Sequence, residues 1–147
     1  QHFWNLKRHL NDSPDCHLEL GFDEDFSHLI YAGADMIIMP SLFEPCGLTQ
    51  MVALKYGTVP IVRGVGGLRD TVFDKDYAHK RREERNGYVF HGADDAGVES
   101  AMHRAIALWY TYPDDFRQLM ICGMNYDYSW CRPGQDYLNI YEHIRCK

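Results

Sequence analysis

Two glycine-rich turns carry most of the chemistry that this sequence offers. The first runs from Pro40 to Gln50 with the letters PSLFEPCGLTQ, and the second runs from Arg63 to Leu68 with the letters RGVGGL. Each turn follows a short apolar run and precedes a helical pattern, so each is expected to present backbone N–H groups where a helix begins. Glycine lets a ligand approach the backbone closely, and unpaired N–H groups attract anions. The two turns together predict a site for a pyrophosphate.

One carboxylate, Glu44, lies inside the first turn. This lone carboxylate lies at the mouth of a helix that is expected to begin near Cys46 or Gly47. The simpler interpretation is that Glu44 caps the following helix and that each glycine serves only its own turn.

The second turn does not match the best-known phosphate-binding patterns. It lacks the GxGxxG spacing of nicotinamide-binding domains and the GxxxxGK[ST] spacing of P-loops. An ordinary nucleotide-binding redox domain is therefore disfavoured.

Short apolar strands alternate with amphipathic helices, and these elements must position the two turns. Strands are predicted at 36–39, 59–62 and 88–90, and a further strand candidate lies at 17–20. Helical spacing predicts helices at 3–10, 25–34, 47–56, 68–73, 94–109, 113–124 and 133–144. This alternation predicts an α/β doubly wound domain with a parallel sheet. Ligands bind such sheets at the carboxyl ends of the strands, which is where both turns lie.

Two further segments carry structural expectations. Residues 74–87 are highly charged and poor in apolar side chains, which predicts a solvated loop. Trp109, Tyr110, Tyr112 and Trp130 offer an aromatic stacking surface, but helix-spaced aromatics are more often buried, and we expect these four in the core.

Composition limits the classes of partner. The 147 residues are 46% hydrophobic and 24% charged, with a formal net charge of −6. This excludes a disordered tail, disfavours a generic nucleic-acid binder, and leaves no apolar stretch near the ~20 residues that span a bilayer. The five cysteines form no CxxC pair, and no His–Cys spacing suits zinc. We expect no disulfide framework, no metal, no nucleic-acid partner and no membrane partner.

The sequence resembles the starch synthases and bacterial glycogen synthases. The resemblance rests on YAGADM at 31–36, PSLFEPCGLTQ at 40–50 and GGLRDTV at 66–72. It continues through NG at 86–87, GAD at 92–94 and DYSW at 127–130, where it is most similar to the class III plant-type starch synthases. The resemblance implies a retaining glucosyltransferase, without a cofactor, that transfers glucose from ADP-glucose to the non-reducing end of an α-1,4-glucan. It also implies a GT-B fold, in which the active site lies between two Rossmann-like domains.

The same resemblance implies roles for individual residues. Glu44 matches the catalytic glutamate that contacts the transferred glucose, and Phe22 matches an aromatic, often tyrosine, that stacks on adenine. Val65 stands where a threonine is common in the family, so one hydroxyl contact is lost. The remaining positions that match the donor-binding turns are Cys46, Gly47, Leu48, Thr49, Gly66, Gly67 and Leu68.

The extent of the resemblance leads to an expectation about the whole chain. We expect residues 1–147 to form a single, shortened C-terminal domain that binds ADP-glucose or ADP, with the glucan acceptor bound by a missing N-terminal domain. The family's diphosphate-gripping arginine and lysine have no counterpart before Gly21, so we expect no synthase activity from the chain alone. The alternative is a non-catalytic nucleotide- or glucan-binding scaffold module. The resemblance implies the plastid stroma for a plant or algal protein and the cytoplasm for a bacterial one.

Overall fold

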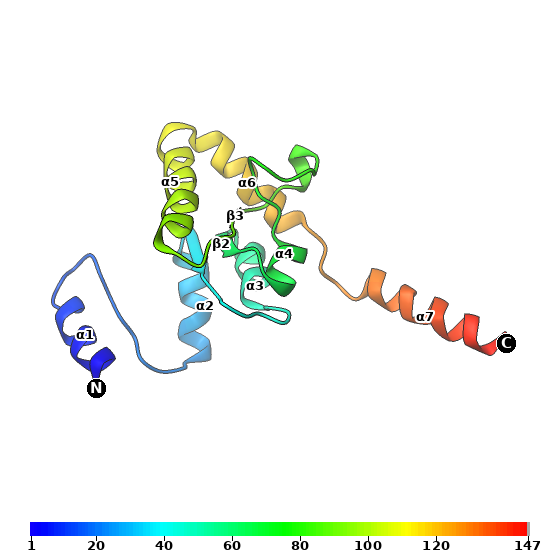
Figure 1. The fold of residues 1–147 in the computed structure, drawn as a ribbon, viewed down its shortest axis with the longest axis horizontal. Coiled ribbons are helices and arrows are strands. Elements are labelled where there is room, and N and C mark those ends of the chain that lie inside the picture. Colours follow the sequence, from blue (N-terminus) through cyan, green and yellow to red (C-terminus); the bar gives the residue numbers. More distant parts are fainter. Residues whose placement is uncertain (147) are drawn as a thin grey trace. The chain divides into compact units, whose positions relative to one another are not determined.

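The computed structural model describes residues 1–146, and their contacts divide the chain into two compact units, Gln1–Gly33 and Ala34–Lys147. The first unit holds two helices, α1 (His2–Leu10) and α2 (Glu24–Gly33), and no residue of either helix is buried (Figure 1). Both helices were predicted from their apolar spacing.

The strand expected at 17–20 is wrong. The N–H of Leu18 donates to Oδ1 of Asn11 at 2.7 Å, and Nδ2 of Asn11 donates back to the Leu18 carbonyl at 3.3 Å. A side-chain amide thus takes both backbone groups that a neighbouring strand would need, and the segment stays irregular.

The second unit is built on a parallel sheet. The strands β1 (Met36–Met39), β2 (Val59–Arg63) and β3 (Tyr88–Phe90) lie in the order β1-β2-β3. Ile37 pairs with Pro60, and Val62 pairs with Val89, both in parallel register. The predicted α/β fold with a parallel sheet is confirmed.

Three helix boundaries in this unit fall at residues that the sequence marks, whereas α3, α4 and α7 begin at 49, 66 and 131 and not at the predicted 47, 68 and 133. Gly57 ends α3 with a left-handed φ of +86°, the side chain of Asp94 accepts the Gly97 N–H at 2.9 Å before α5, and Pro113 opens α6. The helices are α3 (Thr49–Tyr56), α4 (Gly66–Thr71), η1 (Arg82–Glu84), α5 (Asp95–Thr111), α6 (Pro113–Asn125) and α7 (Cys131–Arg145).

The strand β2 is buried on both faces. Ile61 belongs to a core cluster that includes residues of α5 and α6, whereas Val62 belongs to a second cluster with Leu68 of α4. Because neighbouring strand residues point to opposite faces, α5 and α6 cover one face of the sheet and α4 covers the other. Both glycine turns follow strands of this sheet, the first after β1 and the second at the end of β2.

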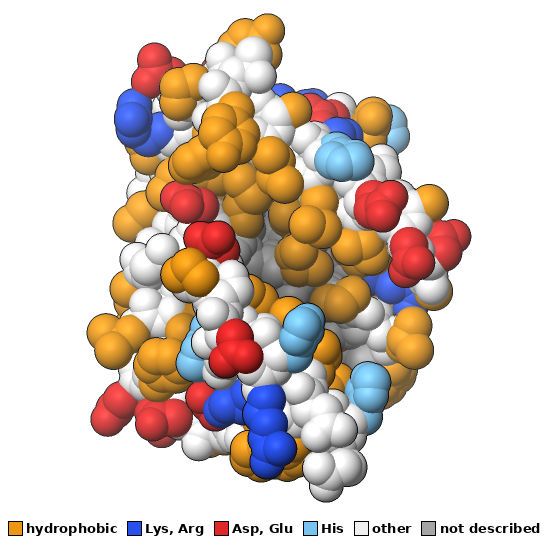
Figure 2. Space-filling view, turned by 90° about the vertical axis from the view of Figure 1, so that its left-hand side faces the viewer, with side chains coloured by type: hydrophobic (Ala, Val, Ile, Leu, Met, Phe, Trp, Pro, Cys, Tyr) orange, Lys and Arg blue, Asp and Glu red, His pale blue; other side chains and the backbone are white. Residues whose placement is uncertain are grey.

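The four aromatics expected in the core lie at the surface instead, which corrects that prediction. Trp109, Tyr110, Tyr112 and Trp130 are 37%, 75%, 60% and 73% exposed. The inner face of α5 is taken by its buried residues Ala101, Ala105 and Leu108, so its aromatic residues face outward. Large hydrophobic side chains are exposed at many other positions as well, and Figure 2 shows them over much of the face drawn.

Candidate functional site

The loop after β1 carries Glu44 and is tied down from two sides. Oγ of Ser41 donates to Oε2 of Glu44 at 3.3 Å, which orients the half-buried carboxylate. Arg63, at the end of β2, donates from Nη1 to the Leu42 carbonyl at 3.1 Å and to the Ser41 carbonyl at 3.5 Å. Its Nε also donates to the His91 carbonyl at 3.4 Å, so Arg63 links the loops that follow β1 and β3.

The start of α3 presents backbone donors next to this carboxylate. Gly47 has a φ of +72°, a left-handed conformation, and α3 begins two residues later without a side-chain cap. Within residues 1–146, the N–H groups of Gly47, Leu48 and Thr49 have no hydrogen-bond acceptor. Unpaired N–H groups at a helix start suit an anionic ligand.

The two glycine turns touch each other through their backbones. A Cβ atom placed on Gly66 would lie 1.7 Å from the carbonyl oxygen of Glu44, and one on Gly67 would lie 1.9 Å from that of Cys46. Only glycine permits this approach at either position. Residues separated by about twenty positions therefore form one continuous backbone surface at the carboxyl ends of β1 and β2.

The other predicted donor-site residues are placed differently from one another. The side chains of Cys46 and Leu48 are exposed, whereas Leu68 is fully buried in the core beneath α4. The N–H of Leu68 donates to the Val65 carbonyl at 3.1 Å, so this group closes a turn rather than facing a ligand. Phe22 belongs to the first unit, where its ring is 87% exposed.

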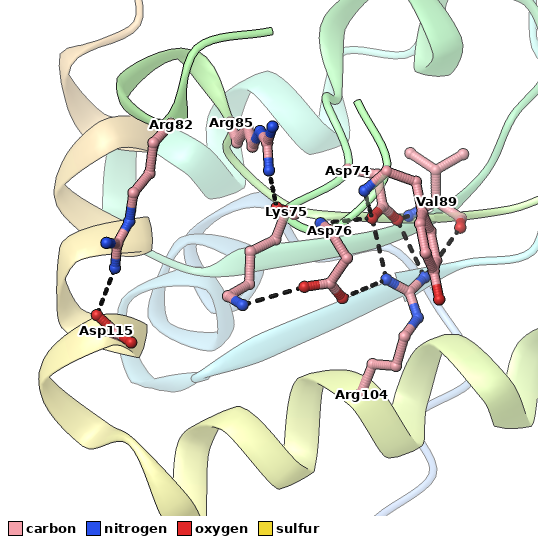
Figure 3. A network of polar contacts seen from close by, with 9 residues as sticks. Asp74, Lys75, Asp76, Arg82, Arg85, Val89, Arg104 and Asp115 are labelled. Carbon is pink, nitrogen blue, oxygen red and sulfur yellow. Dashed lines mark hydrogen bonds and ion pairs between the residues drawn. The ribbon is translucent and has the colours of Figure 1, made fainter. Parts of the chain in front are cut away.

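The charged loop at 74–87 is not simply solvated, which corrects the sequence prediction. Asp74 is 6% exposed, and both of its oxygens accept from the guanidinium of Arg104 on α5 at 3.0 Å (Figure 3). Arg104 also reaches Asp76 at 2.8 Å, and its guanidinium lies over the rings of Tyr77 and Tyr88. The loop is therefore anchored at its first residue by a buried ion pair.

This ion-pair cluster shifts the protonation of its members. Burial opposes the charge of Asp76, but its hydrogen bonds with Arg104 and Lys75 prevail and lower its pKa. Burial likewise opposes the charge of Arg104, yet the bonds to Asp74 and Asp76 raise its pKa. Burial raises the pKa of Tyr88, so its hydroxyl stays protonated. Nothing in the sequence pairs Asp74 with Arg104, because they are thirty positions apart.

A surface pocket of about 550 Å³ lies beside this cluster. It is lined by residues that include Tyr77, Val89, His91 and Arg104, and no residue of the turns at 40–50 and 63–68 lines it. The glycine-turn surface and this pocket are thus separate features.

The part of the chain that the structure describes holds neither a metal-binding cluster nor a membrane-spanning helix. Among residues 1–146, no group of three or more His, Cys, Asp or Glu side chains is arranged to hold a metal ion. Over the same residues, no helix combines the length and the apolar character that crossing a bilayer requires. The five cysteines are free thiols.

Comparison with known sequences finds glycogen synthases. Glycogen synthase 1 of Nitrosococcus oceani is 68% identical over 143 residues, which cover 97% of this chain and 29% of that protein. Glycogen synthase 2 of Methylococcus capsulatus is 62% identical over 146 residues, covering 99% of this chain and 30% of that protein. The chain thus spans about 30% of the length of the curated relatives that it matches. No protein-family model matches the chain.

Solved structures agree with the sequence relatives. The catalytic domain of starch synthase IV from Arabidopsis thaliana, bound to ADP and acarbose, matches with a TM-score of 0.89 and 38% identity. That match covers 97% of this chain and 29% of the other. Sucrose-phosphate synthase from Thermosynechococcus elongatus matches with a TM-score of 0.67 at 23% identity over 99% of this chain and 34% of the other, which shows a shared fold.

Proposed function

Because this chain belongs to the starch and glycogen synthase family, we propose that it forms the nucleotide-sugar-binding part of a retaining glucosyltransferase. The donor in this proposal is ADP-glucose and the acceptor is the non-reducing end of an α-1,4-glucan. The acceptor side would come from the part of the relatives that this chain does not cover. The bacterial curated relatives favour the cytoplasm over a plastid as its compartment.

One observation carries the proposal. The two glycine turns meet backbone to backbone beside a carboxylate, at the carboxyl ends of neighbouring parallel strands. In such sheets this is the place where nucleotides bind. The unpaired N–H groups of Gly47 and Leu48 offer donors for a diphosphate whose negative charge grows as the glycosidic bond breaks.

The proposed roles follow from this arrangement. Glu44 would lie beside the anomeric carbon and favour its oxocarbenium character, while Ser41 keeps the carboxylate oriented. The backbone N–H groups would stabilise the departing ADP without any proton transfer.

Calorimetric titration of the chain with ADP tests this function. We expect binding that Gly47→Trp weakens at least ~10-fold, because the indole would cover the N–H donors of the first turn. The matched control is Gly134→Trp, since a Cβ at Gly134 would meet nothing within 4 Å. The same titration with UDP tests the choice of nucleotide.

A second pair of titrations tests the role of the carboxylate. Glu44→Gln should leave ADP affinity nearly unchanged and should weaken ADP-glucose, because Glu44 is proposed to contact only the sugar. Absence of ADP binding by the wild-type chain, or equal binding by Gly47→Trp, would contradict the proposed function.

A further inference from the structure

We propose that Gln50 is a positioning residue that holds the N–H donors of the first glycine turn facing outward and, through Thr71, ties that turn to the second. The identity of the ligand on those donors, a nucleoside diphosphate, rests on the proposed function. The coupling between the two turns does not.

Gln50 lies beneath the first turn, where its side chain meets three acceptors. It is the second residue of α3 and is fully buried. Its Nε2 donates to the carbonyl oxygens of Cys46 at 3.2 Å and Gly47 at 2.7 Å. It also reaches Oγ1 of Thr71 at 3.0 Å. Three oxygens around one nitrogen fix the orientation of the amide.

This arrangement determines where the N–H groups of the turn point. No peptide bond among the described residues is cis, and in a trans peptide the N–H points opposite to the preceding carbonyl. Because Gln50 draws the Cys46 and Gly47 carbonyls inward, the N–H groups of Gly47 and Leu48 face away from it. The same bonds remove two carbonyl oxygens that would repel a phosphate.

Thr71 extends the connection to the second turn. Its Oγ1 accepts from Gln50 and donates to the Gly67 carbonyl at 2.6 Å. Its own carbonyl accepts from Asn86 Nδ2 at 3.0 Å and from the hydroxyl of Tyr128. Thr71 is therefore anchored on one side and holds Gly67 and Gln50 on the other.

The amide of Gln50 also explains a restriction at Gly47. A Cβ at Gly47 would lie 2.6 Å from Oε1 of Gln50, an oxygen that is buried and has no hydrogen-bond partner among the described residues. An unpaired buried oxygen is costly, and among residues 1–146 only the Nε2 end of this amide has hydrogen-bond partners. A side chain of similar volume without the donor would pack but would not orient the turn.

The first test measures coupling without any ligand, by comparing backbone amide NMR spectra of Thr71→Val, Thr71→Ser and Thr58→Val. Thr71→Val should shift the amide resonances of Gly47 and Leu48, because the hydroxyl that meets Gln50 is lost. Thr71→Ser keeps that hydroxyl and should restore the wild-type positions. Thr58→Val is the matched control, since this buried hydroxyl donates to the Ala34 carbonyl at the other end of β2 and should leave both resonances in place.

The second test measures the consequence for binding. Calorimetry with ADP should give a dissociation constant about tenfold larger for Gln50→Met and Thr71→Val than for the wild type. Thr71→Ser and Thr58→Val should bind as the wild type does. Far-UV circular dichroism checks that each variant is folded, and if Gln50→Met does not fold, Thr71→Val decides.

The outcomes separate this inference from the proposed function. Unchanged Gly47 and Leu48 resonances in Thr71→Val would overturn the coupling, whether or not ADP binds. If the wild type binds ADP and Thr71→Val binds equally well, the positioning role is overturned while the proposed function stands. If the wild type does not bind ADP, the proposed function fails, and the resonances alone decide the coupling.

Discussion

The backbone contact between the two glycine turns can be tested by adding a single methyl group. Gly67→Ala places a Cβ 1.9 Å from the carbonyl oxygen of Cys46 and 2.6 Å from the carbonyl carbon and Cα of that residue. Gly67 does not have a positive φ, so the substitution acts through contact and not through backbone strain. The substitution therefore tests only how closely the two turns approach each other.

The expected cost follows from the size of the displacement. Ordinary van der Waals contact begins at 3.4 Å, so the Cys46 carbonyl must retreat by about 1.5 Å. That movement breaks its hydrogen bond with Gln50, which is 3.2 Å long. Overpacking a dense site costs about 1–3 kcal/mol, and a lost hydrogen bond costs about 1 kcal/mol more. We expect the free energy of unfolding to fall by about 3 kcal/mol.

Urea denaturation followed by circular dichroism measures this free energy. Gly134→Ala is the matched control, because a Cβ there meets nothing and alanine is favoured within a helix by ~0.5–1 kcal/mol. The control should be as stable as the wild type or more so. If the free energy of unfolding of Gly67→Ala lies within about 0.5 kcal/mol of the wild-type value, the two turns do not contact each other as described.

Three further predictions concern the polar interior. Arg104→Met leaves the buried carboxylate of Asp74 without its counter-charge and should lower the free energy of unfolding in urea by about 3–5 kcal/mol. The pKa of Asp76 lies below its ordinary 3.8. The stabilisation from its ionised carboxylate is therefore complete above about pH 4 and is lost as the pH falls through the folded pKa. Between pH 7 and pH 3, the urea midpoint of Arg104→Met should fall less than that of the wild type. In thermal melts, Tyr128→Phe should lower the free energy of unfolding by about 1–2 kcal/mol, because the Tyr128 hydroxyl donates to the Thr71 carbonyl. Tyr88→Phe should leave that free energy unchanged, because the buried Tyr88 hydroxyl has no hydrogen-bond partner among the described residues.

Local signals made much of the fold predictable. Gly57, Asp94 and Pro113 mark helix ends through conformational and capping preferences that act within a few residues. The apolar run of β2 likewise indicates a strand buried on both faces of a sheet. The run of β1 predicts the same and is wrong there, because β1 ends the described sheet and Ile38 is 38% exposed. Where a competing local interaction existed, as for Leu18 with the Asn11 amide, the same reasoning gave a strand that does not form.

The candidate site was predictable only in its chain-local parts. Both glycine turns can be recognised as short sequence motifs, but the side chains that hydrogen-bond to them are brought there by packing between distant segments. Gln50 and Thr71 are 21 positions apart, and no periodicity connects them. Likewise, hydrophobicity alone placed Trp109 inside, whereas the small residues of α5 are the ones that fit against the sheet.

The ion pair between Asp74 and Arg104 has a consequence for β3, which is the last strand in the described sheet. The outward N–H of Val89 donates to Oδ2 of Asp74 at 2.6 Å, and its carbonyl accepts from Arg104 Nη2 at 3.2 Å (Figure 3). An open strand edge recruits strands from other molecules and so promotes aggregation. Here two charged side chains occupy the backbone groups of Val89 that a foreign strand would need, so the ion pair also closes this edge of the sheet to strand addition at Val89.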